Sequence, residues 1–192
     1  LNSFLNSLSN QVIPILLVSY FATDITGQYS MSQTILHLPI SLFSTTLNKV
    51  VYSKLGEKNR DGENLRPFIK NILFFSILLS FIIFLPILIA GPSIFSFVLG
   101  DKWYTAGVYS RILTPWLIIN FILTPITSIV NIKNAQKGGF LFNIIILITR
   151  IISIIIGGLR NDIILTMALL SITGVLFNGS YLIWSIRLSK DD

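Results

Sequence analysis

The chain contains 192 residues, of which 53% are hydrophobic and 11% are charged, and the apolar residues lie in long blocks. This composition excludes a soluble domain and predicts an all-α integral membrane protein, because apolar blocks of roughly 20 residues cross a bilayer as helices. The net charge of +6 needs no nucleic-acid partner, since basic and aromatic residues are not interleaved as in such proteins. The chain contains no cysteine, which excludes disulfides and cysteine-based metal sites.

Six apolar blocks predict the transmembrane helices of one bundle that occupies residues 1–192. They cover residues 5–22, 31–51, 68–90, 112–132, 140–156 and 163–186. Membrane-barrel strands would be about half as long and would alternate apolar with polar residues. The one sizeable connection, residues 52–67, is polar and rich in turn-forming residues, which predicts a cytoplasmic loop with room for a surface helix. The chain begins at Leu1 without an initiating Met, and we expect it to be a fragment or the last part of a longer polypeptide.

Basic residues fall unevenly on the two sides of this predicted bundle. One side carries Lys49, Lys54, Lys58, Arg60, Arg66, Lys70, Lys133, Lys137, Arg187 and Lys190, and the other carries Lys102, Arg111 and Arg160. Short loops that stay in the cytoplasm retain Lys and Arg, so the first side and both termini are predicted to be cytoplasmic. The positive charge then serves mainly as this topological signal and attracts anionic membrane lipids.

The second predicted span carries a polar stripe. Its members are Gln33, His37, Ser41, Ser44 and Asn48, at steps of three or four residues that place them on one helical face. Lipid cannot satisfy such groups, so the stripe is predicted to face other helices or water. Two interpretations stay open: contact with a substrate, or packing through interhelical hydrogen bonds, with His37 as a hydrogen-bonded interior histidine.

The fourth and fifth spans carry polar residues at similar spacing. In the fourth span these are Asn120, Thr124, Thr127 and Asn131, with Arg111 and Thr114 nearer its outer end. In the fifth they are Asn143, Arg150, Ser153 and Gly157, opposite a nearly pure aliphatic face. The candidate substrate-binding residues are therefore Arg150, Asn143, Ser153, His37, Gln33, Ser41, Asn120, Thr124 and Arg111.

Arg150 is the strongest candidate, because it lies near the middle of residues 140–156 among Ile, Leu and Phe. An arginine at the centre of a membrane helix costs about 2.5 to 3.5 kcal/mol on insertion scales, so such a residue usually faces a polar cavity and marks a pathway. The alternatives are an arginine bound to helix carbonyls or one that snorkels toward the interface.

Enzymatic chemistry is not expected from this sequence. All eight acidic residues lie in predicted loops or in the tail, and His37 is the only histidine. Neither a paired carboxylate nor a histidine-based metal cluster can therefore form within the spans. We expect no catalytic site, no metal and no cofactor.

The segment Leu99–Trp116, LGDKWYTAGVYSRILTPW, resembles a segment of bacterial polysaccharide flippases in the multidrug, oligosaccharidyl-lipid and polysaccharide exporter superfamily. The residues that carry the resemblance are Gly100, Trp103, Ala106, Gly107, Tyr109, Leu113 and Pro115. Further parts of the chain are similar to the family pattern, namely Pro14, Gly27-Gln28-Tyr29, Pro39 and Val51-Tyr52. The resemblance extends from about Asn2 to Trp184.

The resemblance implies the C-terminal one of two six-helix lobes, with both ends cytoplasmic, in a bacterial inner membrane. It implies transport of an undecaprenyl-diphosphate-linked oligosaccharide, such as a unit of O-antigen, capsule or exopolysaccharide, from the cytoplasmic to the outer leaflet. The partner would be an N-terminal six-helix lobe, and Arg150 and the polar stripes would line half of a central cavity that is often cationic. An arginine can bind a diphosphate in bidentate fashion. No motif of the family falls on Arg150, whose assignment rests on its position and spacing.

Three alternatives stay open. A cation-coupled multidrug antiporter of the same superfamily would commonly need a carboxylate within the membrane. The others are a non-transporting membrane scaffold and a sugar transferase or polymerase. A transferase or polymerase should show a large outer loop or clustered acid and base residues.

Overall fold

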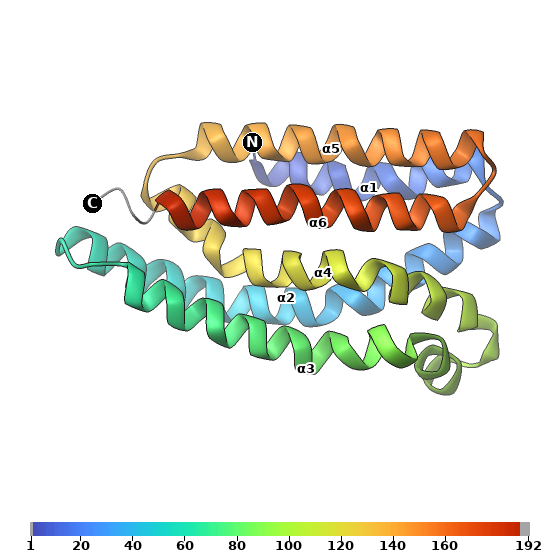
Figure 1. Ribbon diagram of the computed structural model, residues 1–192, viewed down its shortest axis with the longest axis horizontal. Helices are drawn as coiled ribbons and strands as arrows, with labels where there is room; N and C mark the ends of the chain where they lie inside the picture. Colours follow the sequence, from blue (N-terminus) through green and yellow to red (C-terminus); the bar gives the residue numbers. More distant parts are fainter. Residues whose placement is uncertain (1, 189–192) are drawn as a thin grey trace.

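The computed structural model describes the backbone of residues 2–188 and the side chains of residues 11–43 and 48–188. Within these residues the chain is helical, without strands. The elements are α1 (Asn2–Tyr20), α2 (Thr23–Arg60), α3 (Arg66–Leu99), the 3-10 helix η1 (Asp101–Trp103), α4 (Tyr104–Ile132), α5 (Gln136–Leu159) and α6 (Ile163–Arg187). The long helices lie side by side and alternate in direction, so α6 ends toward the end of the bundle at which α1 begins (Figure 1).

Four helical segments in the described part of the chain are long and apolar enough to cross a membrane. They are α3, the segment Asp101–Ile132 that joins η1 to α4, α5 and α6. The protein is therefore an all-α, multi-pass membrane protein, as its composition predicts. The helices α1 and α2 occur where the first two spans were predicted, but the described apolar stretch of α1, Gln11–Tyr20, is shorter. Membrane crossing by α1 and α2 stays a prediction.

The predicted loop at residues 52–67 is wrong over most of its length. Helix α2 continues to Arg60 and α3 begins at Arg66, which leaves only a short turn between them. The cause is an apolar face hidden in a polar sequence, because Val51 and Leu55 are buried against Ile126 and Ile129 of α4. This packing extends the helix past the point at which average polarity predicts a loop.

Helix α4 is the centre of the bundle and packs against α2, α3 and α6. In the apolar part of the segment Asp101–Ile132, 61% of the residues are buried, compared with 17% in the apolar part of α3. The main core gathers around Trp116, Leu117 and Phe121 of α4. Helix α3 instead exposes large apolar side chains such as Phe74 and Ile82, which suits a helix that faces lipid. Helix α4 carries buried polar residues such as Ser110, Thr114 and Ser128, which lipid cannot satisfy, and this explains its position in the interior of the bundle.

Contacting residues of α2 and α4 differ in residue number by the same amount along the whole contact. The two helices run in parallel, and contacting residues are 78 positions apart: Gln28 with Ala106, Ser32 with Ser110, and Phe43 with Phe121. At the N-terminal end of α4, Gln28 accepts a 3.0 Å hydrogen bond from the Ala106 N–H and donates a 2.8 Å one to the Lys102 carbonyl. The Gly27-Gln28-Tyr29 motif thereby holds the start of the Leu99–Trp116 segment in place.

Two glycines allow the sharp connection from α3 to α4. Gly100 follows α3 with φ of 96°, a left-handed conformation that favours glycine. Gly107 lies against α3, where a Cβ would be only 2.5 Å from Pro92 Cα and 2.6 Å from the Gly91 carbonyl oxygen. Backbones this close leave no room for a side chain, so the contact between the C-terminal part of α3 and the N-terminal part of α4 depends on glycine.

Candidate functional site

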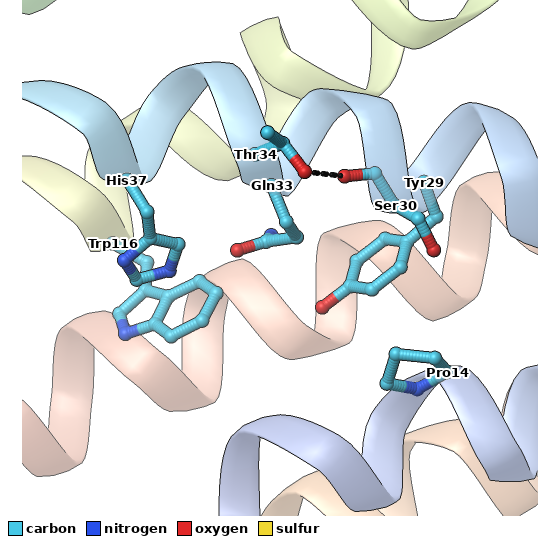
Figure 2. Close-up of a pocket in the computed structure, with 7 residues that line it drawn as sticks. All are labelled: Pro14, Tyr29, Ser30, Gln33, Thr34, His37 and Trp116. Atoms are coloured by element: carbon cyan, nitrogen blue, oxygen red, sulfur yellow. Dashed lines mark hydrogen bonds between the residues drawn. The ribbon is translucent and has the colours of Figure 1, made fainter. Parts of the chain in front are cut away.

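A cavity of about 360 Å³ lies between α1, α2 and α4. Its lining residues are Pro14 of α1, Tyr29, Ser30, Gln33, Thr34 and His37 of α2, and Trp116 of α4. The α2 residues recur every three or four positions, so they occupy one helical face. In Figure 2 the side chains of Tyr29, Gln33 and His37 extend from α2 toward the region between Pro14 and Trp116.

The polar groups of the cavity differ in whether they have a hydrogen-bond partner within the protein. The Thr34 hydroxyl donates a 2.9 Å hydrogen bond to the Ser30 carbonyl within α2. The Gln33 Nε2 atom, in contrast, is buried and has no hydrogen-bond partner among the described residues. A buried amide donor of this kind needs a partner, which water or a ligand in the cavity can supply. Gln33 and His37 are the two predicted site residues that line this cavity.

Arg150 lies next to the cavity on α5 and is 7% exposed. Its guanidinium carbon lies 4.7 Å from the centroid of the Trp116 ring, which is a cation–π contact. Its charge also interacts electrostatically with Tyr29 and His37, both of which line the cavity. Arg150 is thus not one of the lining residues but contacts one of them directly. Its positive charge is placed within reach of the cavity from α5.

The other α5 candidates lie inside the bundle to different degrees. Ser153 is 2% exposed and donates a 2.7 Å hydrogen bond to the Thr149 carbonyl, while Asn143 is half-buried. The aliphatic face opposite them is exposed, as the sequence predicts, and includes Ile145, Ile148 and Ile152. Arg150 and Ser153 therefore face the interior rather than lipid. The Ser153 hydroxyl is already satisfied by its own helix, which suits a packing role.

The C-terminal part of the α2 stripe lies at the same level along the bundle as the α4 stripe. The offset of 78 residues between contacting positions of α2 and α4 places Ser41 at the level of residue 119, next to Asn120 in the chain. Ser41 is exposed and donates to the Leu38 carbonyl at 2.9 Å, and the half-buried Thr124 donates to the Asn120 carbonyl at 2.8 Å. Asn48 is half-buried, and the side chain of Ser44 lies outside the described residues. The described hydrogen bonds of these residues stay within their own helices, so the structure shows the two stripes at the same level of the bundle and no contact between them.

Arg111 is the candidate that the structure does not bring to the cavity. It is exposed in the N-terminal part of α4, and its Cβ lies 3.5 Å from where a Cβ on Gly91 of α3 would be. Arg111 therefore lies on the α3 side of α4, whereas Trp116 lies toward α2, α5 and α6. Its assignment to substrate binding stays a prediction without geometric support.

Several residues that line the cavity do not belong to the polar stripe predicted from the sequence. Tyr29, Ser30 and Thr34 adjoin the Gln33 and His37 face of α2, so helical spacing extended one turn toward the N-terminal end of α2 could have found them. No sequence signal identified Trp116, because an aromatic residue among aliphatic ones usually indicates ordinary core packing. Its role depends on the neighbours that three other helices bring to it.

The fold and the cavity together define a multi-pass membrane protein with a partly open cavity, lined by polar and apolar side chains, beside a buried cation. A family model described as "Polysaccharide biosynthesis protein" matches residues 1–107, and the chain belongs to this family. The match covers α1, α2, α3 and the start of α4, including the α1 and α2 walls of the cavity. Neither a curated protein nor a solved structure matches the chain. The protein thus has a role in polysaccharide biosynthesis and is embedded in a membrane.

Proposed function

We propose that this chain is one lobe of a flippase that moves an undecaprenyl-diphosphate-linked oligosaccharide from the cytoplasmic to the outer leaflet. The observation that carries the proposal is the position of Arg150, buried against Trp116 at the edge of the cavity. Membership in the polysaccharide biosynthesis family supports a saccharide substrate. The chain would act as a transporter without enzymatic activity and without a cofactor.

The chemistry of the cavity suits an anionic glycolipid. A cation in a low-dielectric interior attracts a diphosphate more strongly than one in water, and this attraction does not require direct contact. The amide of Gln33, the imidazole of His37 and the hydroxyls of Ser30 and Thr34 suit hydrogen bonding to sugar hydroxyls or to phosphate oxygens. Direct bidentate contact between Arg150 and the diphosphate would require movement of Trp116 or of the guanidinium.

The pathway would be completed by an N-terminal six-helix lobe, with this chain in the bacterial inner membrane and both of its ends in the cytoplasm. The alternating helices and the uneven distribution of basic residues support this orientation. Acidic residues of the described chain lie at or near helix ends, as Asp24, Asp101 and Asp162 do. This distribution gives no support to the cation-coupled antiporter alternative, which would need a carboxylate within the membrane.

The experiment is the replacement of Arg150 in the complete polypeptide that carries this lobe. Arg150→Ala is expected to abolish or sharply reduce surface polysaccharide at an unchanged protein level in the membrane, and Arg150→Lys should restore part of it by restoring the charge. Arg160→Ala is the matched control, because Arg160 is exposed just after the same helix. Full polysaccharide export by the Arg150→Ala protein would overturn the proposal.

A further inference from the structure

Trp116 occupies a point at which residues from three other helices meet. Its side chain is 2% exposed, and it lines the cavity together with residues of α2. Arg150 of α5 lies over its ring at 4.7 Å from the centroid. Gly174 of α6 lies against the pyrrole edge of the same ring. One side chain of α4 therefore contacts α5, α6 and the cavity wall at once.

Gly174 is the residue that makes room for this indole. A Cβ on Gly174 would overlap Cγ and Cδ1 of Trp116 and would lie 2.9 Å from Nε1. Glycine within a helix is less favourable than alanine by about 1 kcal/mol, so a glycine that accepts an aromatic ring has a packing reason. The backbone of α6 thus limits where the ring plane of Trp116 can lie.

The position of the ring contributes to where the charge of Arg150 is held. An arginine side chain has many rotamers, and a guanidinium over a desolvated indole is held by the negative face of the ring. Movement of the ring would carry the preferred guanidinium position with it. The charge would then change its distance from Tyr29 and His37, the two cavity residues with which it interacts electrostatically.

We propose that Trp116 is a positioning residue for transport: its indole, held in place by Gly174, keeps the Arg150 guanidinium beside the cavity wall formed by α2. The inference rests on the proposed function, because it assigns a partner to the charge on which that function depends. It is a separate claim, since Arg150 could serve transport without depending on the electrons of the ring. Trp116 acts here through Arg150 and needs no contact with the substrate.

The decisive experiment replaces Trp116 in the complete polypeptide by tryptophans with increasing numbers of ring fluorines. Fluorine withdraws electron density from the ring face and changes its shape very little, so packing on Gly174 is kept. Export of the glycolipid is expected to fall with each added fluorine, by roughly tenfold across the series, the loss expected from a buried cation–π contact. A constant export rate across the series would overturn the positioning role.

A spectroscopic measurement tests the same contact independently of transport. Fluorine NMR of protein labelled with 5-fluorotryptophan should show a Trp116 resonance that shifts in Arg150→Met, while those of Trp103 and Trp184 stay in place. Gly174→Ala should shift the Trp116 resonance and reduce export, whereas Gly179→Ala should do neither, because nothing lies within 4 Å of a Cβ at Gly179. An unshifted Trp116 resonance in Arg150→Met would contradict the contact.

The outcomes separate this inference from the proposed function. If Arg150→Ala exports normally, the flippase proposal fails and the positioning role fails with it. If Arg150→Ala loses export but the fluorinated series exports at a constant rate, only the positioning role fails. A graded loss in the fluorinated series together with loss in Arg150→Ala supports both.

Discussion

The hydroxyl oxygens of Ser32 and Ser110 lie 2.8 Å apart in the buried contact between α2 and α4. Both side chains are fully buried, so each hydroxyl depends on the other in a region without water. The pair has the same offset of 78 residues as Gln28 and Ala106, which are joined at the N-terminal end of α4. It therefore links the helix that carries the cavity face to the central helix of the bundle.

Replacement of both of these serines should destabilise the bundle by less than the sum of the two single replacements. Ser32→Ala and Ser110→Ala are each expected to lower the free energy of unfolding by about 1 kcal/mol, because each leaves a buried hydroxyl without its partner. The double variant should lose less than the sum of the two. Equilibrium unfolding in mixed micelles measures the three changes. Strict additivity would show that the two hydroxyls do not interact.

Gly107→Ala should disrupt the close contact between the C-terminal part of α3 and the N-terminal part of α4. The added Cβ would lie 2.5 Å from Pro92 Cα, and relief of this overlap requires backbone movement. We expect a loss of stability of about 1 to 3 kcal/mol. Gly56→Ala is the control, because nothing lies within 4 Å of a Cβ there and alanine favours the helix. Thermal denaturation of both purified variants compares them, and equal melting temperatures would contradict the close packing.

Cysteine labelling should distinguish the cavity face of α2 from its other faces. The chain contains no cysteine, so single replacements are clean probes. Gln33→Cys and Thr34→Cys are expected to react with a small charged thiol reagent, because both positions line the cavity. Leu36→Cys, at a fully buried position, and Leu38→Cys, on an exposed apolar surface, should not react. Equal labelling at all four positions, measured by mass spectrometry, would contradict a hydrated cavity confined to one face.

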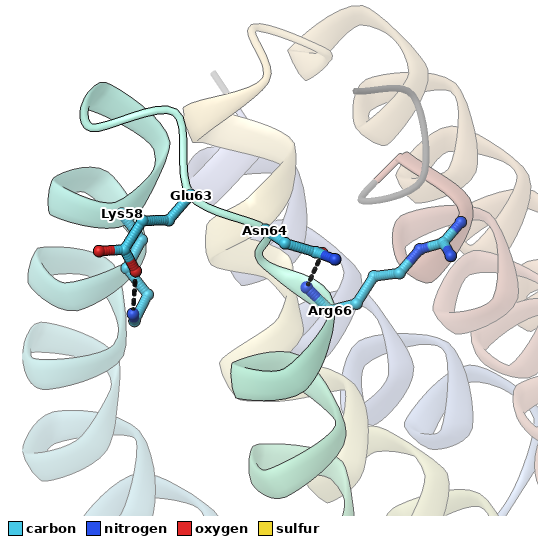
Figure 3. Close-up of polar contacts among 4 residues, drawn as sticks. All are labelled: Lys58, Glu63, Asn64 and Arg66. Carbon is cyan, nitrogen blue, oxygen red and sulfur yellow. Dashed lines mark hydrogen bonds and ion pairs between the residues drawn. The ribbon is translucent and has the colours of Figure 1, made fainter.

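The ion pair between Lys58 and Glu63, at the turn between α2 and α3, should raise the pKa of Lys58 without affecting transport. Figure 3 shows Lys58 paired with Glu63 beside the turn, where the hydrogen bond and the charge of Glu63 raise the pKa of Lys58 above its ordinary value. A raised lysine pKa contributes stability that is complete below about pH 10.4 and is lost as the pH rises through the raised value. The pair is solvent-exposed, so its contribution at neutral pH is small.

Glu63→Gln is therefore expected to lower the pKa of Lys58 and to leave polysaccharide export unchanged. NMR of reductively methylated lysines measures the titration, and Lys54 serves as the internal reference because it lies one turn away on the same helix. A Lys58 pKa that does not respond to Glu63→Gln would show that the pair does not form in the membrane-embedded protein.

Helix periodicity allowed part of the site to be predicted. Gln33 and His37 were placed on one face by their spacing, and the structure brings both to the cavity. Spacing also predicted that Arg150 and Ser153 lie opposite an aliphatic face, and both are buried. Spacing could not show which hydroxyls line the cavity, as that of Thr34 does, and which lie elsewhere, as those of Ser153 and Thr124 do, because both kinds recur with the same helical period.

Composition and block length alone were enough to establish a helical membrane protein, because the free energy of placing apolar residues in lipid depends on their number and order and not on their neighbours. These two properties did not predict the extension of α2 to Arg60, which depends on burial of Leu55 against α4. They also assigned no role to Trp116. Contacts of that kind depend on how the helices are packed together, and only the tertiary structure places Arg150 and Gly174 against one ring beside the cavity.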